Sequence, residues 1–182
     1  MAVRNSDLID AEKGVFSVLG LVALRLGGPY WWNGEDIDEE IFKGAVFRAY
    51  EPEDAEKGCL DVASITVVDA TNDPTEPDIS TLEEGGVPSL DSFLHESIKT
   101  QLMADGMELI KWMSSNLNHS GNLKVLVTAY IANDQGKQRQ FIALRTKAKD
   151  RKIVAIGVFD VEKKEVLAVP IFNIMQNMVV LG

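Results

Sequence analysis

The side chains best suited to bind a transition metal are few in this sequence. The chain contains two histidines, His95 and His119, and one cysteine, Cys59. A zinc site needs three or four ligands, nearly always nitrogen or sulfur atoms, so these residues do not favour one. The acidic run from Glu35 to Glu40 lacks the alternating ligands and the central glycine of an EF-hand calcium loop. We therefore expect no resident metal ion.

Catalytic motifs are also missing from the sequence. The tripeptide His119-Ser120-Gly121 sets a histidine beside a serine, which is typical of a polar turn, and no Gly-x-Ser-x-Gly nucleophile elbow is present. Neither of the glycine-rich phosphate-binding motifs occurs. The sequence thus predicts a protein that is not an enzyme and needs no cofactor. A hydrolase or transferase that uses acidic residues stays open as an alternative, because sequence alone does not give the distance between two carboxylates.

Aromatic residues next to acidic ones indicate a protein interface instead. Tyr30, Trp31 and Trp32 directly precede an acidic run, and such rings dominate interface hot spots that are surrounded by a charged rim. Three large rings in a row cannot all be buried on one side of a strand or loop, so the alternative is that one or two of them anchor the core. More acids follow in the segment 73–78. The predicted partner-binding residues are Tyr30, Trp31, Trp32, Glu35, Asp36, Asp38, Glu39, Glu40, Asp73, Glu76 and Asp78.

Charge is segregated along the 182-residue chain, whose formal charge is −10. The segment Glu35–Asp91 has 17 acidic and three basic residues and a local charge of −14, whereas Lys137–Lys152 has a local charge of +6. This pattern predicts a dipolar molecule with an acidic surface for a basic protein partner, although two solvated faces would give the same pattern. Affinity for phosphates comes from clustered cations, so nucleic acid is not an expected partner.

The N-terminal part and the cysteine content bear on location. A single cysteine allows no intramolecular disulfide and is typical of a reducing compartment. Residues Met1–Glu12 lack the basic start of a signal peptide. The apolar stretch Val15–Leu24 would rise about 15 Å as a helix, half of a bilayer core. We expect a cytoplasmic protein without membrane insertion.

Hydrophobic periodicity predicts one α+β domain, an antiparallel meander sheet with flanking amphipathic helices. Residues 1–44 form an N-terminal extension of uncertain role in this prediction, and residues 60–180 form one continuous sheet-helix core. Val15–Leu26 fits a helix or a strand equally well. The connection Asp69–Pro88 has three prolines and six acids and is expected to be mobile or ordered by a partner. The other elements expected are helices over Asp36–Phe42, Ser89–Ala104 and Glu162–Val180, the last with its path reset at Pro170, strands over Ala45–Tyr50, Leu60–Val68, Met107–Ser114, Val125–Ile131, Gln138–Thr146 and Ile153–Phe159, and turns over Asn133–Gly136 and Lys149–Arg151.

This order of elements resembles the PsbP-like superfamily, which includes DcrB-type lipoproteins, Ran-binding Mog proteins and the Eag chaperones of type VI secretion. The resemblance covers about Leu60–Val180, and the first 44 residues have no counterpart in it. The superfamily has no common catalytic residues and its members mostly bind other proteins, so the resemblance implies protein binding. The residues that carry it are Ala63–Val68, Ser89–Leu102, Lys124–Ala132, Gln140–Thr146, Ile153–Phe159 and Pro170–Val180.

The sequence therefore leads to a non-enzymatic protein-binding module. Its most concrete form is a bacterial immunity protein whose carboxylates neutralise a cationic toxin. The resemblance implies an alternative, a type VI secretion chaperone or adaptor that holds an apolar effector segment on its sheet. Salt weakens binding that is steered by acidic residues and leaves apolar binding intact, so salt dependence separates the two.

Overall fold

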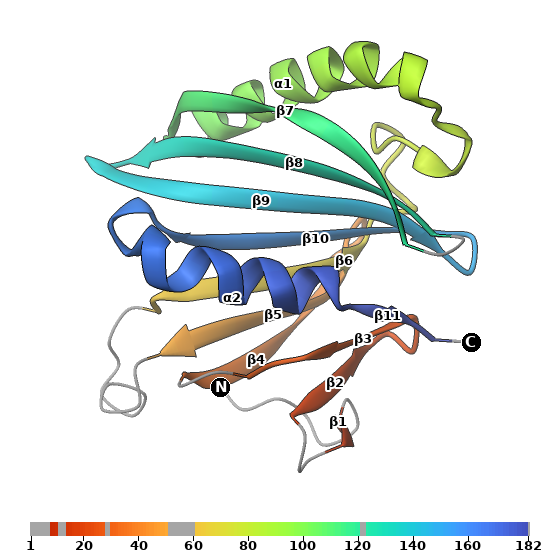
Figure 1. Ribbon diagram of the computed structural model, residues 1–182, viewed down its shortest axis with the longest axis vertical. Helices are drawn as coiled ribbons and strands as arrows, with labels where there is room; N and C mark the ends of the chain where they lie inside the picture. Colours follow the sequence, from red (N-terminus) through yellow and green to blue (C-terminus); the bar gives the residue numbers. More distant parts are fainter. Residues whose placement is uncertain (1–7, 11–13, 28–29, 51–60, 121–122, 182) are drawn as a thin grey trace.

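A seven-stranded antiparallel sheet with a helix on each face forms the centre of the molecule (Figure 1). The structure is a computed structural model that describes residues 8–10, 14–27, 30–50, 61–120 and 123–181. A smaller four-stranded sheet packs on the same face of the large sheet as the second helix. The α+β class and the antiparallel meander predicted from the sequence are thus confirmed.

The large sheet has the strand order β4-β5-β6-β10-β9-β8-β7, and the small sheet has the order β1-β2-β3-β11. The strands of the large sheet are β4 (Trp31–Asp38), β5 (Lys43–Tyr50), β6 (Ala63–Asp69), β7 (Glu108–Ser120), β8 (Leu123–Asp134), β9 (Lys137–Ala148) and β10 (Arg151–Asp160). The remaining elements are β1 (Leu8–Asp10), β2 (Val15–Val18), β3 (Val22–Arg25), β11 (Val179–Val180), α1 (Val87–Ala104) and α2 (Lys164–Gln176). Short 3-10 turns cover Ile79–Thr81, Glu84–Gly86 and Val161–Lys163.

Two tight turns close the meander where the sequence predicts them. Gln135 and Gly136 have φ values of 53° and 87°, and Lys149 and Asp150 have φ values of 48° and 61°. Two successive residues at positive φ make the hairpin turn whose twist matches that of antiparallel strands. Glycine makes the first of these turns easy, whereas the second places two residues with side chains in the left-handed region.

The two helices cover opposite faces of the sheet, and two separate hydrophobic clusters result. Side chains alternate along β8, so Leu126 packs under α1 while Val127 contacts the cluster under α2. The single continuous core predicted for residues 60–180 is therefore wrong. Val22 and Leu24 of the small sheet are also buried in the larger cluster, so this part of residues 1–44 belongs to the core rather than to an extension.

Three segments in the N-terminal part and the C-terminal tail differ from the sequence predictions or were left open by them. The segment predicted as a helix over Asp36–Phe42 is the end of β4 and a turn in which the Glu39 amide donates to the Phe42 carbonyl oxygen at 2.9 Å. Pairing with β5 outweighs the weak helix signal of its acids. Val15–Leu26 forms the hairpin β2–β3 around Leu19 and Gly20, both at positive φ. The tail is a helix that ends at Gln176, after which β11 pairs with β3.

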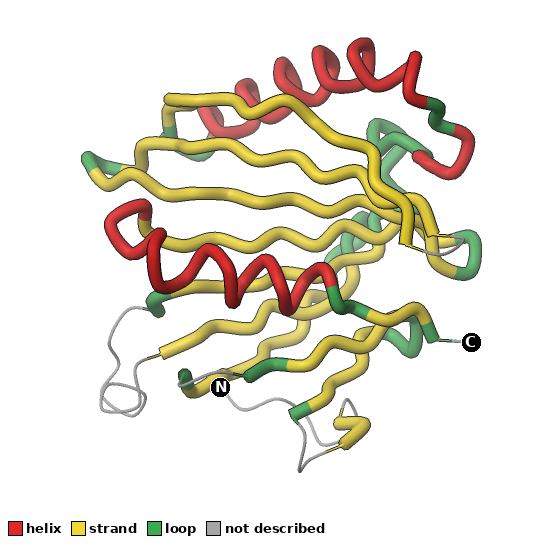
Figure 2. The backbone as a smooth tube through the Cα atoms, viewed as in Figure 1, coloured by secondary structure: helices red, strands yellow, loops and turns green. Residues whose placement is uncertain are grey.

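The second helix runs across a face of the large sheet (Figure 2). It lies close to that face because Gly157 of β10 has no side chain beneath it. A Cβ atom at Gly157 would lie 2.7 Å from Ile171 and 2.7 Å from Met175 of α2. In the described part of the chain, no helix is long and apolar enough to cross a membrane.

Candidate functional site

The first helix covers only one end of its face of the large sheet. Its buried residues Leu94, Ile98 and Leu102 pack against β7 and β8. In the part of the chain that the structure describes, no helix covers the same face of β10, β6, β5 and β4 (Figure 1). This open part of the sheet, the side of α1 and the connection 70–78 enclose a groove of about 310 Å³.

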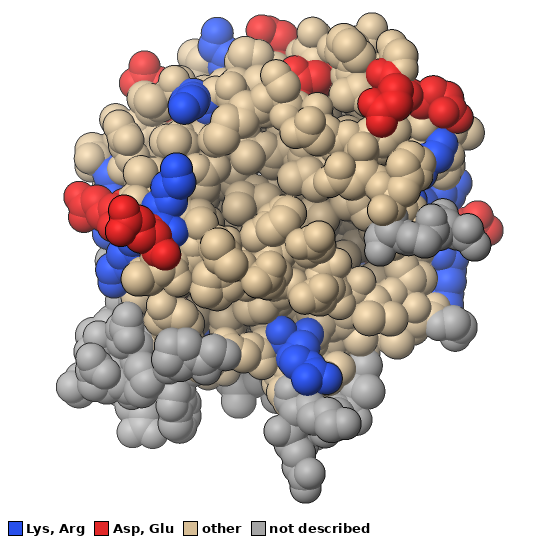
Figure 3. Space-filling model, in the orientation of Figure 1, with Lys and Arg blue, Asp and Glu red and all other residues tan. Residues whose placement is uncertain are grey.

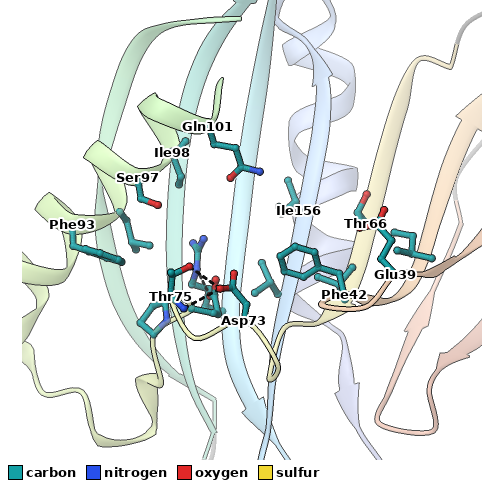
Figure 4. A pocket seen from close by; sticks show the side chains of 17 residues that line it. Glu39, Phe42, Thr66, Asp73, Thr75, Phe93, Ser97, Ile98, Gln101 and Ile156 are labelled. Atoms are coloured by element: carbon teal, nitrogen blue, oxygen red, sulfur yellow. Dashed lines mark hydrogen bonds and ion pairs between the residues drawn. The ribbon is translucent and has the colours of Figure 1, made fainter. Parts of the chain in front are cut away.

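The groove has an apolar floor and two aromatic walls. Val68 of β6 and Val154 and Ile156 of β10 line the floor. Phe93 projects from α1 on one side and Phe42 from the β4–β5 turn on the other (Figure 4). The Phe93 side chain is 48% exposed, so the groove presents a large apolar ring to solvent. The polar lining residues are Glu39, Thr66, Asp73, Thr75, Glu76, Ser97, Gln101 and Arg145.

An aromatic stack and one carboxylate hold α1 in place as a wall of the groove. The rings of His95 and Trp112 stack at 4.8 Å, and Trp112, Tyr130 and Phe141 continue the stack across β7, β8 and β9. Asp91 of α1 accepts hydrogen bonds from Trp112 Nε1 at 3.1 Å and from the backbone amide and hydroxyl of Ser115 at 2.7 and 2.6 Å. These contacts fix the helix to β7, as a binding site built on rigid elements requires.

Ion pairs fasten the acidic connection to the cationic strands of the meander. Three carboxylates of this segment meet bases on β9 and β10, and Lys152 Nζ also donates to the Glu76 carbonyl oxygen at 2.6 Å. The expected mobile connection is thus not supported, and three acids of the predicted acidic surface are neutralised by bases of the predicted basic segment. The pairs are Asp69–Arg151 at 2.7 Å, Glu76–Arg145 at 2.8 Å and Asp78–Lys147 at 2.8 Å.

The same connection contains three local turns that the sequence could have revealed. An Asp-x-Thr/Ser pattern recurs at 69–71, 73–75 and 78–80, and in each case the aspartate accepts from the backbone amide two residues later at 2.9 Å. Such Asx turns give a segment without periodicity a defined conformation. The hydrogen bonds from Lys147 and Ser80 hold the pKa of Asp78 well below its usual range.

Arg145 is the buried base of the groove. Its side chain is 9% exposed, and its Nε donates to Glu76 Oε1 at 2.8 Å. Its Nη1 is buried and has no hydrogen-bond partner among the described residues. Burial raises the pKa of the neighbouring Tyr130 hydroxyl to about 12, and the positive charge of Arg145 opposes this rise.

The predicted partner-binding residues do not form one surface. Tyr30 and Trp32 pack at the edge of the cluster under α2, and the Trp32 indole donates to the Gly27 carbonyl oxygen at 3.2 Å. The Trp31 side chain lies outside the described structure. Glu35 forms an ion pair with Arg48 at 3.0 Å. The structure distributes the remaining acids as follows: Asp36, Asp38 and Glu40 are exposed around the β4–β5 turn, Asp78 pairs with Lys147, and Glu39, Asp73 and Glu76 line the groove.

The residues with metal or nucleophile chemistry are dispersed. His95 is part of the aromatic stack, whereas His119 is exposed near the end of β7. Within the described ranges no three or more His, Cys, Asp or Glu side chains are placed to hold a metal ion. Cys59 lies outside those ranges. The face that carries α2 has its charged side chains near the margins and a largely uncharged centre (Figure 3).

Comparison with solved structures identifies a shared architecture. No protein-family model and no curated protein matches this sequence. The chain is similar to the cyanobacterial PsbP protein CyanoP from Synechocystis sp. PCC 6803, with a TM-score of 0.63 and 12% sequence identity over 95% of this chain and 90% of that one. LpqN of Mycobacterium tuberculosis, described as involved in cell envelope biogenesis, matches with a TM-score of 0.45 and 10% identity over 86% of this chain and 87% of that one. A Pseudomonas aeruginosa protein of unknown function matches with a TM-score of 0.40 and 8% identity over 91% of this chain and 94% of that one.

Proposed function

We propose that this chain, which has a PsbP-like fold, is a non-enzymatic binding module that holds an apolar segment of another polypeptide in the groove beside α1. The observation that carries this proposal is the open apolar part of the large sheet between α1 and the β4–β5 turn. The proposal corresponds to the adaptor or chaperone alternative that the sequence left open.

Apolar contact supplies the attraction in this proposal. Phe93 is 48% exposed, and a phenylalanine side chain buries about 150–250 Å² when it is fully covered. Covering its exposed half removes about 100 Å² from water, which contributes about 2.5 kcal/mol. Phe42 and Ile156 add to the same surface. A segment with two or three adjacent apolar side chains would therefore bind without any catalytic group.

The charge of the groove lining sets a second requirement for the partner. Three carboxylates, of Glu39, Asp73 and Glu76, line the groove against the single guanidinium of Arg145. A segment whose apolar residues are flanked by lysine or arginine complements this lining, and the overall charge of −10 attracts such a segment over a longer range.

The immunity function expected from the sequence is a second candidate, which the exposure of the β4–β5 turn favours. Asp38, Glu39 and Glu40 are exposed at this turn, with Asp38 lying 3.6 Å from the exposed Lys43, and these carboxylates would steer a cationic toxin. Glu76 and Asp78 of the connection do not add to that surface, because they are paired with bases of β9. Binding through the turn would weaken steeply between low and high salt, whereas binding in the groove, where apolar contact supplies the main attraction, would weaken less.

Selection of peptides against the full chain tests the groove. A random library of 12-residue peptides displayed on phage is panned on the protein, and the affinities of the selected peptides are measured by fluorescence anisotropy. Phe93→Asp changes an exposed groove residue and should weaken binding at least tenfold. The matched control is Met103→Asp, because Met103 is another apolar α1 residue that is 65% exposed but does not line the groove. Peptides that bind Phe93→Asp as tightly as the native chain would refute the proposal.

A further inference from the structure

We infer that Arg145 is the polar anchor of the groove, and that its Nη1 donates a hydrogen bond to an uncharged carbonyl oxygen, such as a peptide carbonyl, of the segment bound there. This inference rests on the proposed function and adds the chemistry that the occupant must present. In this arrangement Arg145 recognises the backbone of the bound segment, while the apolar residues of the groove contact the side chains of that segment.

The hydrogen bonds of the Arg145 guanidinium are incomplete. A guanidinium has five N–H donors and no acceptor. Arg145 lines the groove; its Nε donor is used by Glu76, whereas its Nη1 is buried and has no acceptor among the described residues. A buried donor without a partner costs free energy, and the cost is larger for a charged group. An acceptor that enters the groove would remove this cost.

The Arg145 guanidinium is also held in place by its neighbours. Arg145 lies on β9 between Leu126 of β8 and Val154 of β10 in the strand register. Its partner Glu76 is fixed in turn by Lys152, which donates to the Glu76 carbonyl oxygen at 2.6 Å. The donor is therefore oriented before any ligand arrives, so binding costs little conformational entropy.

The charge of the groove lining favours an uncharged acceptor over an anion. Among the described residues, the charged side chains that line the groove are three carboxylates and the Arg145 guanidinium. Glu76 already balances the charge of Arg145, and Glu39 and Asp73 leave an excess of negative charge. An anion would be repelled by this excess, whereas a carbonyl oxygen accepts a hydrogen bond without bringing charge.

Another arginine of the same strand provides an internal control. Arg139 Nε is also buried without a hydrogen-bond partner among the described residues. It lies near Asp134, at 3.6 Å, and does not line the groove. A ligand that binds as inferred should affect Arg145 and leave Arg139 unchanged.

Two small probes test the inference on the full chain. N-acetyl-L-leucine methylamide carries an apolar side chain and peptide carbonyls, and N-acetyl-L-leucine carries the same side chain with a free carboxylate. Each probe is titrated into protein labelled with ¹⁵N-arginine and ¹³C-methyl groups. We expect the methylamide to shift the Arg145 side-chain signals and the Val154 and Ile156 methyl signals along one saturation curve, with Arg139 unaffected and with weaker binding of the carboxylate.

A double variant measures the contribution of the anchor. Arg145→Met together with Glu76→Gln removes the donor without leaving a lone buried carboxylate. Its affinity for the methylamide should fall about tenfold, the loss expected for one hydrogen bond from a charged donor. If this variant does not fold, the titration of the native chain still shows whether the methylamide contacts Arg145.

The outcomes separate the inference from the proposed function. Shifts of the Val154 and Ile156 methyl signals without any shift at Arg145 would overturn the anchor and leave the groove as a binding site. No shift at either place would overturn both. Tighter binding of N-acetyl-L-leucine than of the methylamide, with Arg145 shifted, would replace the uncharged carbonyl by an anion and so overturn the inference as stated.

Discussion

Glu76→Gln should strongly destabilise the protein, because it removes the only charge that compensates the buried Arg145 guanidinium among the described contacts. The side chains of this pair are 9% and 13% exposed. Breaking a buried ion pair costs about 3–5 kcal/mol. The amide oxygen of glutamine keeps an acceptor worth about 1 kcal/mol. The expected loss in the free energy of unfolding is therefore about 2–4 kcal/mol, a large part of the stability of a domain.

Urea unfolding followed by circular dichroism measures this loss. Glu83→Gln is the matched control, since Glu83 belongs to the same connection and pairs with Lys124 at 3.5 Å with its side chain 85% exposed. Exposed pairs contribute less than about 1 kcal/mol, so this control should change little. Adding Arg145→Met to Glu76→Gln should restore at least half of the loss. Equal effects of Glu76→Gln and Glu83→Gln would refute the reasoning, because the Glu76 pair would then behave as a surface pair.

Three further outcomes are expected from the packing and the charges. Hydrogen bonds from Thr71 and Arg151 outweigh the burial of Asp69 and hold the pKa of its carboxyl below the ordinary 3.8. The contribution of Asp69 to stability is therefore present above pH 3.8 and is lost as the pH falls through the lowered pKa. Acid unfolding followed by fluorescence should show a weaker pH dependence in Asp69→Asn than in the native chain. Gly157→Ala should lower the free energy of unfolding by about 1–3 kcal/mol, because its Cβ would crowd α2 at 2.7 Å, and a melting temperature equal to that of the native chain would contradict this. Leu126→Ala removes a side chain that is 0% exposed and should cost about 2–5 kcal/mol in urea unfolding, whereas a loss below 1 kcal/mol would mean that the cluster under α1 is misassigned.

Local patterns in the sequence were sufficient for the elements of the meander and for α1. Strict alternation along Val125–Ile131 and Gln138–Thr146 predicted β8 and β9, and the turn residues Asn133–Gly136 predicted the hairpin between them. The apolar spacing over Ser89–Ala104 predicted a helix that the structure extends by two residues, to Val87. These signals are reliable because period 2, period 3.6 and positive φ are properties of a few neighbouring residues.

Where local signals were weak or in conflict, strand pairing decided the outcome. The acids over Asp36–Phe42 favour a helix start, but seven residues make a marginal helix, and register with β5 makes the first three residues of the segment the end of a strand. Val15–Leu26 carried no decisive periodicity, and its two strands exist because the large sheet offers Phe47 and its neighbours as an apolar surface.

The candidate site depended on tertiary structure throughout. The sequence showed an acidic segment and a basic segment, and only the fold determined that Glu76 meets Arg145, 69 residues away, and that Asp69 meets Arg151. The groove likewise arises because α1 covers β7 and β8 and leaves the same face of β6 and β10 open. The pattern of residues along the sequence shows which side chains share a face of one helix or strand. Charge pairing and uncovered surface instead depend on which elements become neighbours, and strand order and helix placement decide which elements those are.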